Sequence, residues 1–342
     1  MSAPSVRVTI KDVAAAAGVS KGAVSLAFND KPGVSDATRE RIFAAARRLG
    51  WAPNSSARSL SRQSVDTVGL AICRPARLLG LEPFYMEFVS GIESVLAERD
   101  CSLLLRLVGS LEEEIGLQER WWRARQVGGS ILVDFHGEDP RIAPLRRIGL
   151  PAVAVGHPSL TGGFPSVWTD DAAAVAEAVR YLAVLGHRRI AHVGGPRGLG
   201  HSAIRTTAFE QTMTELGLER GPHVETGFSG EDGARATRSL LLSAERPTAI
   251  LYDNDIMAVA GLGVAAEMGV SVPDDVSLLA WDDSQLCRLT HPTLSAMSHD
   301  VHGFGAQVAR VLFEVLAGHD VTSLPVATPS LVPRASTAPP PA

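Results

Sequence analysis

The chain has 342 residues, 45% of them hydrophobic, a net charge of −5 and a mean hydropathy of +0.11. This composition excludes a disordered chain, and the length suffices for two or three domains with a large core. No apolar stretch reaches the roughly 18 residues of a membrane helix, and the first residues lack the apolar run of a signal peptide. We therefore expect a cytoplasmic protein without a membrane span, and the three isolated cysteines fit that reducing compartment.

The charge is distributed unevenly along the chain. Residues 1–65 hold ten Lys and Arg but only four Asp and Glu, which gives this segment a net charge of +6. The remaining residues carry 22 basic and 33 acidic side chains, a net charge of −11. A basic segment attached to an acidic body is typical of a nucleic-acid-binding module joined to a second domain.

Residues 9–50 are predicted to form three short helices. Thr9 and Asp12 are spaced as a capping-box-like pair, and Ser20 is an N-cap residue type for the second helix. Gly18 permits the left-handed conformation of a tight turn between the first two helices. A helix, a glycine turn and a second helix form the helix-turn-helix pattern, in which the second helix enters the DNA major groove.

From residue 67 onward, apolar runs alternate with amphipathic stretches, which predicts parallel α/β sheets. The first set has strands over 67–72, 101–108, 128–134 and 151–156 and helices over 84–100, 112–125 and 141–148. A second set begins near Val167, with helices over 171–185, 204–216, 234–242 and 255–269 and strands over 188–195, 224–228, 248–253 and 276–281. A long helix is expected over 301–316.

Ordered matches along the whole chain carry a resemblance to a known family. In the N-terminal segment they are IKDVA (10–14), AGVS (17–20), VS (24–25), Asn29, PGV (32–34), TR (38–39), LG (49–50), PN (53–54), AR (57–58) and Leu60. In the body they are PFY (83–85), GIE (91–93), ILVD (131–134), DPR (139–141), DD (170–171), LGHRRIAHVGGP (185–196), NDIMA (254–258), VPDDVS (272–277), WDD (281–283) and PRASTAP (333–339). On these residues the chain resembles the LacI/GalR family of bacterial transcription regulators.

The resemblance implies an all-α helix-turn-helix headpiece with a hinge helix, followed by a two-lobe α/β core with parallel sheets, like that of periplasmic binding proteins. It places the headpiece at 7–53, the hinge helix and linker at 54–65, and the effector-binding and dimerisation core at 66–338. Both lobes would be discontinuous. The first would span about 66–165 plus a returning segment at about 296–324, and the second about 166–295 plus about 325–338.

The same resemblance implies the DNA contacts. The candidates are Thr9, Ser20, Lys21, Gly22, Ser25, Leu26, Asn29, Asn54, Ala57, Arg58 and Leu60. Lys21 can donate to guanine acceptors or to a phosphate. Leu26 stands where many family members have a polar or basic residue, so it either contacts a thymine methyl or lies against another residue. Leu60 is either a wedge for the minor groove or an apolar anchor of a short hinge helix. That helix is marginal alone, so we expect it to order on DNA beside a dimer mate.

A sugar-sized ligand needs aromatic faces and charged hydrogen-bonding groups. The resemblance places Phe84, Tyr85, His136, Asp171, His201, Arg205, Phe228, Asn254 and Asp282 around an interlobe cleft. Structural alternatives exist for these residues: Arg205 can pair with a surface acid, Phe228 can belong to the core, and Phe84 and Asn254 can support the fold. Trp168 and Trp281 depart from the family pattern.

These features favour a ligand-responsive transcription regulator, a repressor that binds a pseudo-palindromic operator as a homodimer. Its partners would be double-stranded operator DNA and a sugar or sugar derivative, with no membrane partner. A solute-binding protein of the same fold is the alternative, which the basic headpiece opposes. An α/β enzyme is a third, but the sequence has no nucleophile elbow, Walker or metalloprotease motif, and Gly261-x-Gly263-x-x-Ala266 lies inside a helical stretch. We expect no enzymatic activity, cofactor or metal.

Overall fold

The protein forms two compact units, Met1–Asp66 and Thr67–Ala342. The computed structural model describes residues 8–29, 31–52, 66–75, 79–219 and 221–341. The described part of the first unit contains the helices α1 Ile10–Ala17, α2 Lys21–Phe28 and α3 Asp36–Leu49. The predicted helix starts are confirmed, because the Asp12 carboxylate accepts from the Thr9 N–H at 2.8 Å and the Ser20 hydroxyl accepts from the Ala23 N–H at 3.1 Å. Gly18 ends α1 with φ of 67°.

A small apolar core holds these three helices together. Each helix contributes to it, through the residues Val13, Ala14, Val24, Ala27, Ile42, Ala45 and Ala46. The ring of Phe28 lies edge-on to those of Phe43 and Trp51, with centroids 4.9 and 5.2 Å apart. Val24 is fully buried, so one side of α2 is fixed against the core and its opposite side is left to solvent.

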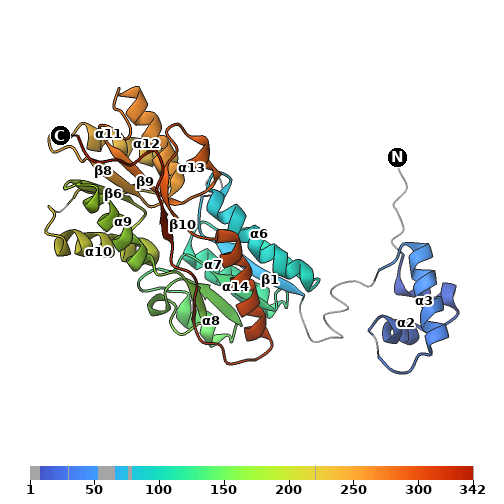
Figure 1. Cartoon of the computed structure of the whole chain (residues 1–342). Coiled ribbons are helices and arrows are strands. Elements are labelled where there is room, and N and C mark those ends of the chain that lie inside the picture. The colour runs from blue at the N-terminus through green and yellow to red at the C-terminus, as the bar shows by residue number, and fades with distance from the viewer. Residues whose placement is uncertain (1–7, 30, 53–65, 76–78, 220, 342) are drawn as a thin grey trace. The chain divides into compact units, whose positions relative to one another are not determined.

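The second unit is built on two six-stranded sheets (Figure 1). The first has the order β11-β5-β4-β3-β1-β2, with β1 Thr67–Ile72, β2 Ser102–Leu107, β3 Gly129–Leu132, β4 Ala152–Val155, β5 Ser166–Trp168 and β11 Leu324–Pro325. The second has the order β12-β10-β9-β8-β6-β7, with β6 Ile190–Gly194, β7 His223–Glu225, β8 Ala249–Tyr252, β9 Ser277–Asp282, β10 Ser295–Ser298 and β12 Ser330–Val332. All neighbouring strands are parallel except β10 and β12. Each sheet with its helices forms one lobe.

The helices alternate with these strands as predicted. The first lobe contains α6 Pro83–Glu98, α7 Leu111–Arg123, α8 Ile142–Arg147, the 3₁₀ turn η1 Pro158–Leu160 and α14 Val301–Leu316. The second contains α9 Asp171–Val184, α10 Gly200–Glu215, α11 Gly230–Leu241, α12 Asp255–Glu267 and α13 Gln285–Leu289. Within the described residues, no helix has the length and apolarity needed to cross a membrane.

In the described core the chain passes between the lobes at three places, and two of these differ from the expected boundaries. The second set was expected to begin near Val167, but β5 hydrogen-bonds to β4 in the first sheet, and Val167 is buried in the first-lobe core. The returning segment was expected from about residue 296, but β10 is paired with β9 in the second sheet, so the crossing lies between β10 and α14. Both boundaries are shifted because a short strand, β5 in the first sheet and β10 in the second, is added to its sheet before the chain crosses to the other lobe.

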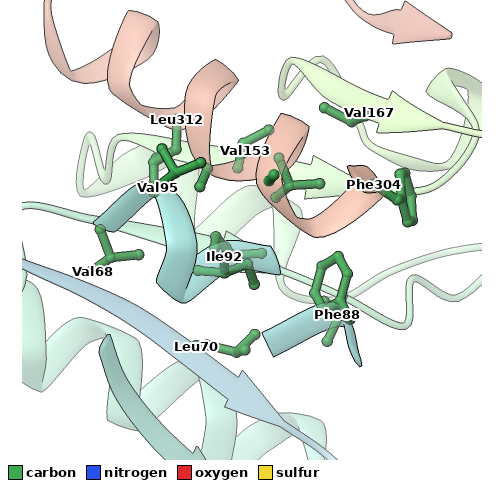
Figure 2. Packing of buried hydrophobic residues seen from close by; sticks show 14 of the residues in the cluster. Val68, Leu70, Phe88, Ile92, Val95, Val153, Val167, Phe304 and Leu312 are labelled. Atoms are coloured by element: carbon green, nitrogen blue, oxygen red, sulfur yellow. The ribbon is translucent and has the colours of Figure 1, made fainter. Parts of the chain in front are cut away.

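The first-lobe core lies between α6, α14 and the sheet. Figure 2 shows Phe88, Ile92 and Val95 of α6 directed toward side chains of α14 and of the strands, among them Leu70 and Leu312. In Figure 1, α14 runs beside α6, although more than 200 residues separate them in sequence. Glycines permit this closeness: a Cβ on Gly91 would overlap the carbonyl oxygen of His302, and one on Gly305 would overlap that of Phe88.

Two second-lobe helices begin four residues before their predicted starts. The helix expected from Ile204 begins at Gly200, and the one expected from Ala234 begins at Gly230. Ser229 caps α11, because its hydroxyl accepts from the Asp232 N–H at 3.1 Å. At α10 the residue before the helix is Leu199, which provides no side-chain cap, so the sequence held no start signal there.

Candidate functional site

One face of α2 carries most of the candidate DNA contacts in the described headpiece. Ser20, Lys21, Gly22 and Ser25 are all exposed at or near the N-terminal end of this helix. Their position follows from the cap at Ser20 and from the burial of Val24 on the opposite side. The exposed end therefore presents an ammonium group, hydroxyls and unobstructed backbone, which are the groups that contact bases and phosphates.

The other headpiece candidates have local partners or lie outside the described residues. Thr9 is exposed and its hydroxyl donates to Asp12 at 2.7 Å. Asn29 follows α2, and its amide donates to the Ser25 carbonyl at 2.8 Å. Leu26 is half-buried and its side chain lies close to Gly33, because a Cβ added to that glycine would be in contact with Leu26 Cδ1. Leu26 therefore has a neighbour within the headpiece. The hinge candidates Asn54, Ala57, Arg58 and Leu60 fall outside the described residues.

A cavity of about 370 Å³ lies between the two lobes of the core. Eight of the nine predicted ligand residues line it: Phe84, Tyr85, Asp171, His201, Arg205, Phe228, Asn254 and Asp282. They lie at or just after the carboxyl ends of strands such as β8 and β9, or in the first two turns of α6, α9 and α10. Binding sites of parallel α/β sheets are found at this edge, and the volume is within the range of small-molecule pockets.

The first-lobe wall is built on an ion pair that sequence reasoning missed. Arg74, two residues after β1, donates to both carboxylate oxygens of Asp134, at 2.8 and 3.1 Å, and the Tyr85 hydroxyl donates to the same carboxylate at 2.7 Å. Burial alone would raise the pKa of the Asp134 carboxyl, but the Arg74 charge and these hydrogen bonds outweigh it and hold the pKa below its usual range. The sequence signal that could have identified Arg74 and Asp134 as cavity residues is their position just after the end of a strand.

A buried arginine fixes the loop that carries Asp134. Arg141 is 1% exposed and donates to the carbonyls of Val133 at 2.9 Å and Asp134 at 3.0 Å. Its charge is balanced by Glu114 at 2.8 Å and Asp139 at 2.7 Å. The loop is therefore held from behind by hydrogen bonds that do not depend on a ligand.

The second-lobe wall contains another such pair. Arg205 Nε donates to Asp171 at 2.8 Å, and Nη1 donates to the carbonyl oxygen of Asp253 at 3.1 Å. The guanidinium also lies 4.1 Å from the ring centroid of Trp281, the aromatic residue that departs from the family pattern. The alternative considered for Arg205 was an ion pair with a surface acid. Arg205 does pair with an acid, but that acid, Asp171, lines the cavity and is 8% exposed.

Aromatic side chains cover the space between these pairs. Phe84 stacks on Phe88 at 5.8 Å and on His299 at 6.3 Å, and His299 Nε2 lies 3.1 Å from the Asp282 carboxylate. Phe228 stacks on His201 at 5.9 Å. The arrangement gives apolar faces flanked by hydrogen-bonding groups, which is the pattern that sugar rings require.

Three cavity residues have a left-handed backbone. Asp134, Phe228 and Asp282 have φ of 54°, 67° and 80°, although none is glycine. Such conformations cost free energy and persist where surrounding contacts hold them, most often at binding sites. Each of these residues lies at the end of a strand or in the loop after one, where the turn directs its side chain toward the cavity.

The carboxyl groups of Glu82 and Asp255 line the cavity and form no ion pair with a described cationic side chain. The Glu82 carboxylate accepts from the Asn254 amide of the other lobe at 3.4 Å, and burial raises its pKa to about 7 against the attraction of Arg74. Burial, with the charge of Asp282, raises the pKa of Asp255 to about 6. Asn254 also caps α12, accepting from the Met257 N–H at 2.9 Å, so it has the structural role considered for it.

His136 is the predicted ligand residue that does not line the cavity. It forms an isolated antiparallel bridge with Leu199 of the other lobe, and its N–H donates to Asp139 at 3.0 Å. Beside it the Gly200 N–H donates to the Phe135 carbonyl at 2.7 Å. The histidine was misplaced because the chain turns at this strand end into the contact between the lobes.

Two observations concern the glycine pattern of α12 and the grouping of metal-ligating residue types. Gly261 lies in the middle of α12, where an added Cβ would overlap the Tyr252 hydroxyl, so the glycine pattern serves helix packing as expected. No group of three His, Cys, Asp or Glu within the described ranges is placed to hold a metal ion.

Comparison with known proteins identifies both units. Residues 9–54 match the model of bacterial regulatory proteins of the lacI family, and residues 179–337 match a periplasmic binding protein-like domain. The chain is 31% identical to the HTH-type transcriptional regulator CelR of Thermobifida fusca, over 91% of this chain and 93% of that protein.

Solved structures agree with this result along nearly the whole length. The complex of the regulator CelR with cellobiose has a TM-score of 0.72 and 30% identity, covering 96% of this chain and all of that one. The lac repressor dimer bound to operator and the anti-inducer ONPF has a TM-score of 0.87 and 26% identity, covering 97% and 100%. With its helix-turn-helix headpiece and two-lobe α/β core, the chain belongs to the LacI family of bacterial transcription regulators.

Proposed function

We propose that the protein is a cytoplasmic repressor that binds a pseudo-palindromic operator as a homodimer and responds to a sugar or sugar derivative. One observation supports this most directly: a single chain joins an exposed recognition-helix face to a preformed cavity lined by aromatic and charged side chains. CelR binds cellobiose and the lac repressor binds operator as a dimer, which agrees with both parts of the proposal. No catalytic step is included.

On the DNA side, the proposed roles follow the position of each residue. Ser20, Lys21, Gly22 and Ser25 would face the major groove from the first two turns of α2. Thr9 and Asn29 would contact the backbone or the groove edge, and Leu26 would contact a thymine methyl or remain packed within the headpiece. Asn54, Ala57, Arg58 and Leu60 would form the hinge contact in the minor groove, with Leu60 as the wedge.

On the ligand side, Arg205 and Asp282 would bind hydroxyl groups from the second lobe, and Phe84, Tyr85 and Phe228 would cover the faces of the ring. A ligand that contacts both lobes changes the free energy of one lobe arrangement relative to another. Through the linker this difference would change how readily the two hinge helices of a dimer order on DNA.

Fluorescence anisotropy with labelled promoter fragments tests the proposal. We expect saturable, sequence-dependent binding at physiological salt, a dimer in sedimentation, and a change in affinity of at least about tenfold with one member of a sugar panel. Arg235→Ala removes an exposed charge on α11, away from both sites, and is the control: it should leave operator affinity and the response to the sugar unchanged. Equal affinity for promoter and random DNA would contradict the proposal.

A further inference from the structure

The walls of the cavity carry many more acids than bases. Among the described residues that line it, the acids come from both lobes and are Glu82, Asp134, Asp170, Asp171, Asp253, Asp255 and Asp282. The cationic side chains that never lose their charge are Arg74 and Arg205. A ligand therefore meets mainly acceptor oxygens.

Both guanidinium groups are already neutralised within the walls. Arg74 is bound by both oxygens of Asp134, and its cation also lies 4.8 Å from the Phe228 ring centroid. Arg205 is held by Asp171 at 2.8 Å and by the Asp253 carbonyl. The charge of each arginine is thus offset by a carboxylate, so an anion beside it would gain little net attraction while it meets the remaining acids of the walls.

Helix N-termini are the other common anion sites, and at three of those beside the cavity one of the first donors already has a partner. Asp170 accepts from the Ala173 N–H of α9 at 2.9 Å, and Asn254 accepts from the first turn of α12. The Gly200 N–H of α10 donates to the Phe135 carbonyl. Helix α6 begins with Pro83, which has no N–H.

The histidines of the cavity are also engaged by groups of the walls. Burial, together with the charge of Arg205, lowers the pKa of His201 to about 4, so this ring is neutral at physiological pH. His299 lies against the carboxylate of Asp282. His157 Nδ1 lies 2.8 Å from the Ser159 hydroxyl, and its ring is edge-on to Trp168 at 4.7 Å.

We infer that the cavity takes an uncharged polyhydroxyl compound and rejects the phosphorylated or carboxylated form of the same compound. This inference rests on the function proposed above and narrows its ligand class. Hydroxyl groups can donate to the carboxylate oxygens of both lobes, including the unpaired Glu82 and Asp255, whereas an anion brings only acceptors and a like charge.

Calorimetric titration of the full chain with matched pairs tests this inference. The probes are glucose, cellobiose and trehalose, each beside its 6-phosphate, and the effect of each on operator affinity is measured in parallel. At least one neutral sugar should bind, and its phosphate should bind at least about a hundredfold more weakly. A phosphate that binds as tightly as its parent sugar overturns the inference but leaves the proposed function intact. If no probe binds or changes operator affinity, the sugar-responsive function fails with it.

Two isosteric variants assign the selectivity to these walls. Glu82→Gln and Asp255→Asn each remove one carboxyl group that has no cationic partner, and at pH 8 both groups are mainly ionised in the wild type. At that pH we expect each variant to narrow the gap in affinity between the sugar and its phosphate by about tenfold. Glu98→Gln, exposed at the far end of the same helix α6, is the control and should leave the gap unchanged. Equal gaps in the wild type and both variants would overturn the assignment, and the thermal midpoint of each variant checks that it is folded.

Discussion

Glu82 shows how burial controls a single side chain of this cavity. It precedes α6 as its N-cap residue, is 8% exposed, and faces Arg74 together with the carboxylates of Asp134, Asp255 and Asp282. Its only described hydrogen bond comes from Asn254 of the other lobe. Because burial outweighs the attraction of Arg74, this carboxyl keeps its proton to an unusually high pH, and its pKa is raised to about 7.

A pH-dependent stability follows from this shift. The folded-state pKa of Glu82 lies above its ordinary value of 4.5, so the folded protein binds the extra proton between those two values. The resulting stabilisation is fully present below pH 4.5 and is lost as the pH rises through 7. Glu82→Gln should therefore gain stability relative to the wild type between pH 5 and 8, by about 3 kcal/mol at most.

Urea unfolding of both proteins at several pH values measures this difference. Glu98→Gln, on the exposed end of the same helix, is the control for removing a carboxyl group from this helix. A constant difference between Glu82→Gln and the wild type would contradict the raised pKa.

Lys21 is the residue at which the headpiece proposal is most directly tested. Its exposed ammonium group lies in the first turn of α2, with no described partner that would hold it away from DNA. Lys21→Ala should weaken operator binding. If the contact is with phosphate, the loss is uniform across sequences and the salt slope falls by about one; if it is with guanine, the loss is about 1–3 kcal/mol on the cognate base pair only. Unchanged affinity and salt slope in anisotropy titrations would remove Lys21 from the interface.

The residues that sequence reasoning found and missed differ in a physical way. Arg205 and Asp282 were placed at the cleft by the resemblance to the family, and both line the cavity. Arg74 and Asp134 were missed as a pair, because nothing in the sequence links two loops 60 residues apart. Only the parallel pairing of β1 with β3 places them side by side.

At the scale of elements, long segments with a regular apolar pattern were predicted well, and the short elements beside them were predicted poorly. The helix predicted over 301–316 has those bounds in the structure, because its apolar face is buried along its whole length. The strands β10, β11 and β12 and the helix α13 were not predicted. They have five residues or fewer and owe their form to the sheet or lobe beside them, so their own sequences carry little signal.

The crossing of α6 and α14 predicts a strong effect at one glycine. A Cβ on Gly305 would overlap the Phe88 carbonyl of α6, so Gly305→Val must separate the two helices and should destabilise the core by about 1–3 kcal/mol or more. Gly263→Ala is the matched control, because Gly263 is exposed in α12 with no atom near its position for a Cβ. It should stabilise the protein by about 0.5–1 kcal/mol. Equal denaturation midpoints for Gly305→Val and the wild type would exclude this close helix contact.

At the scale of the whole core, the two lobes are joined by contacts as well as by the chain. The first N–H of α10 has its partner across the lobe boundary, in the Phe135 carbonyl, and Leu160 of η1 packs against Gly200. Helix N-termini leave their first donors without internal partners, so this tertiary contact replaces the side-chain cap that Leu199 cannot provide. It also explains why sequence reasoning placed the start of α10 a full turn too late.

Closure of the lobes at this point should be necessary for the response to the ligand. A Cβ on Gly200 would overlap the Leu160 side chain, so Gly200→Val should hold the lobes apart on this side of the cavity. We expect the variant to bind operator DNA, to bind the sugar at least about tenfold more weakly, and to exchange the amide hydrogens at the start of α10 faster. Gly137→Ala, in the adjacent first-lobe loop with open space around it, should leave all three properties unchanged. Unaltered sugar affinity in Gly200→Val would show that ligand binding does not depend on this contact, and the response would then have to be carried by the walls of the cavity alone.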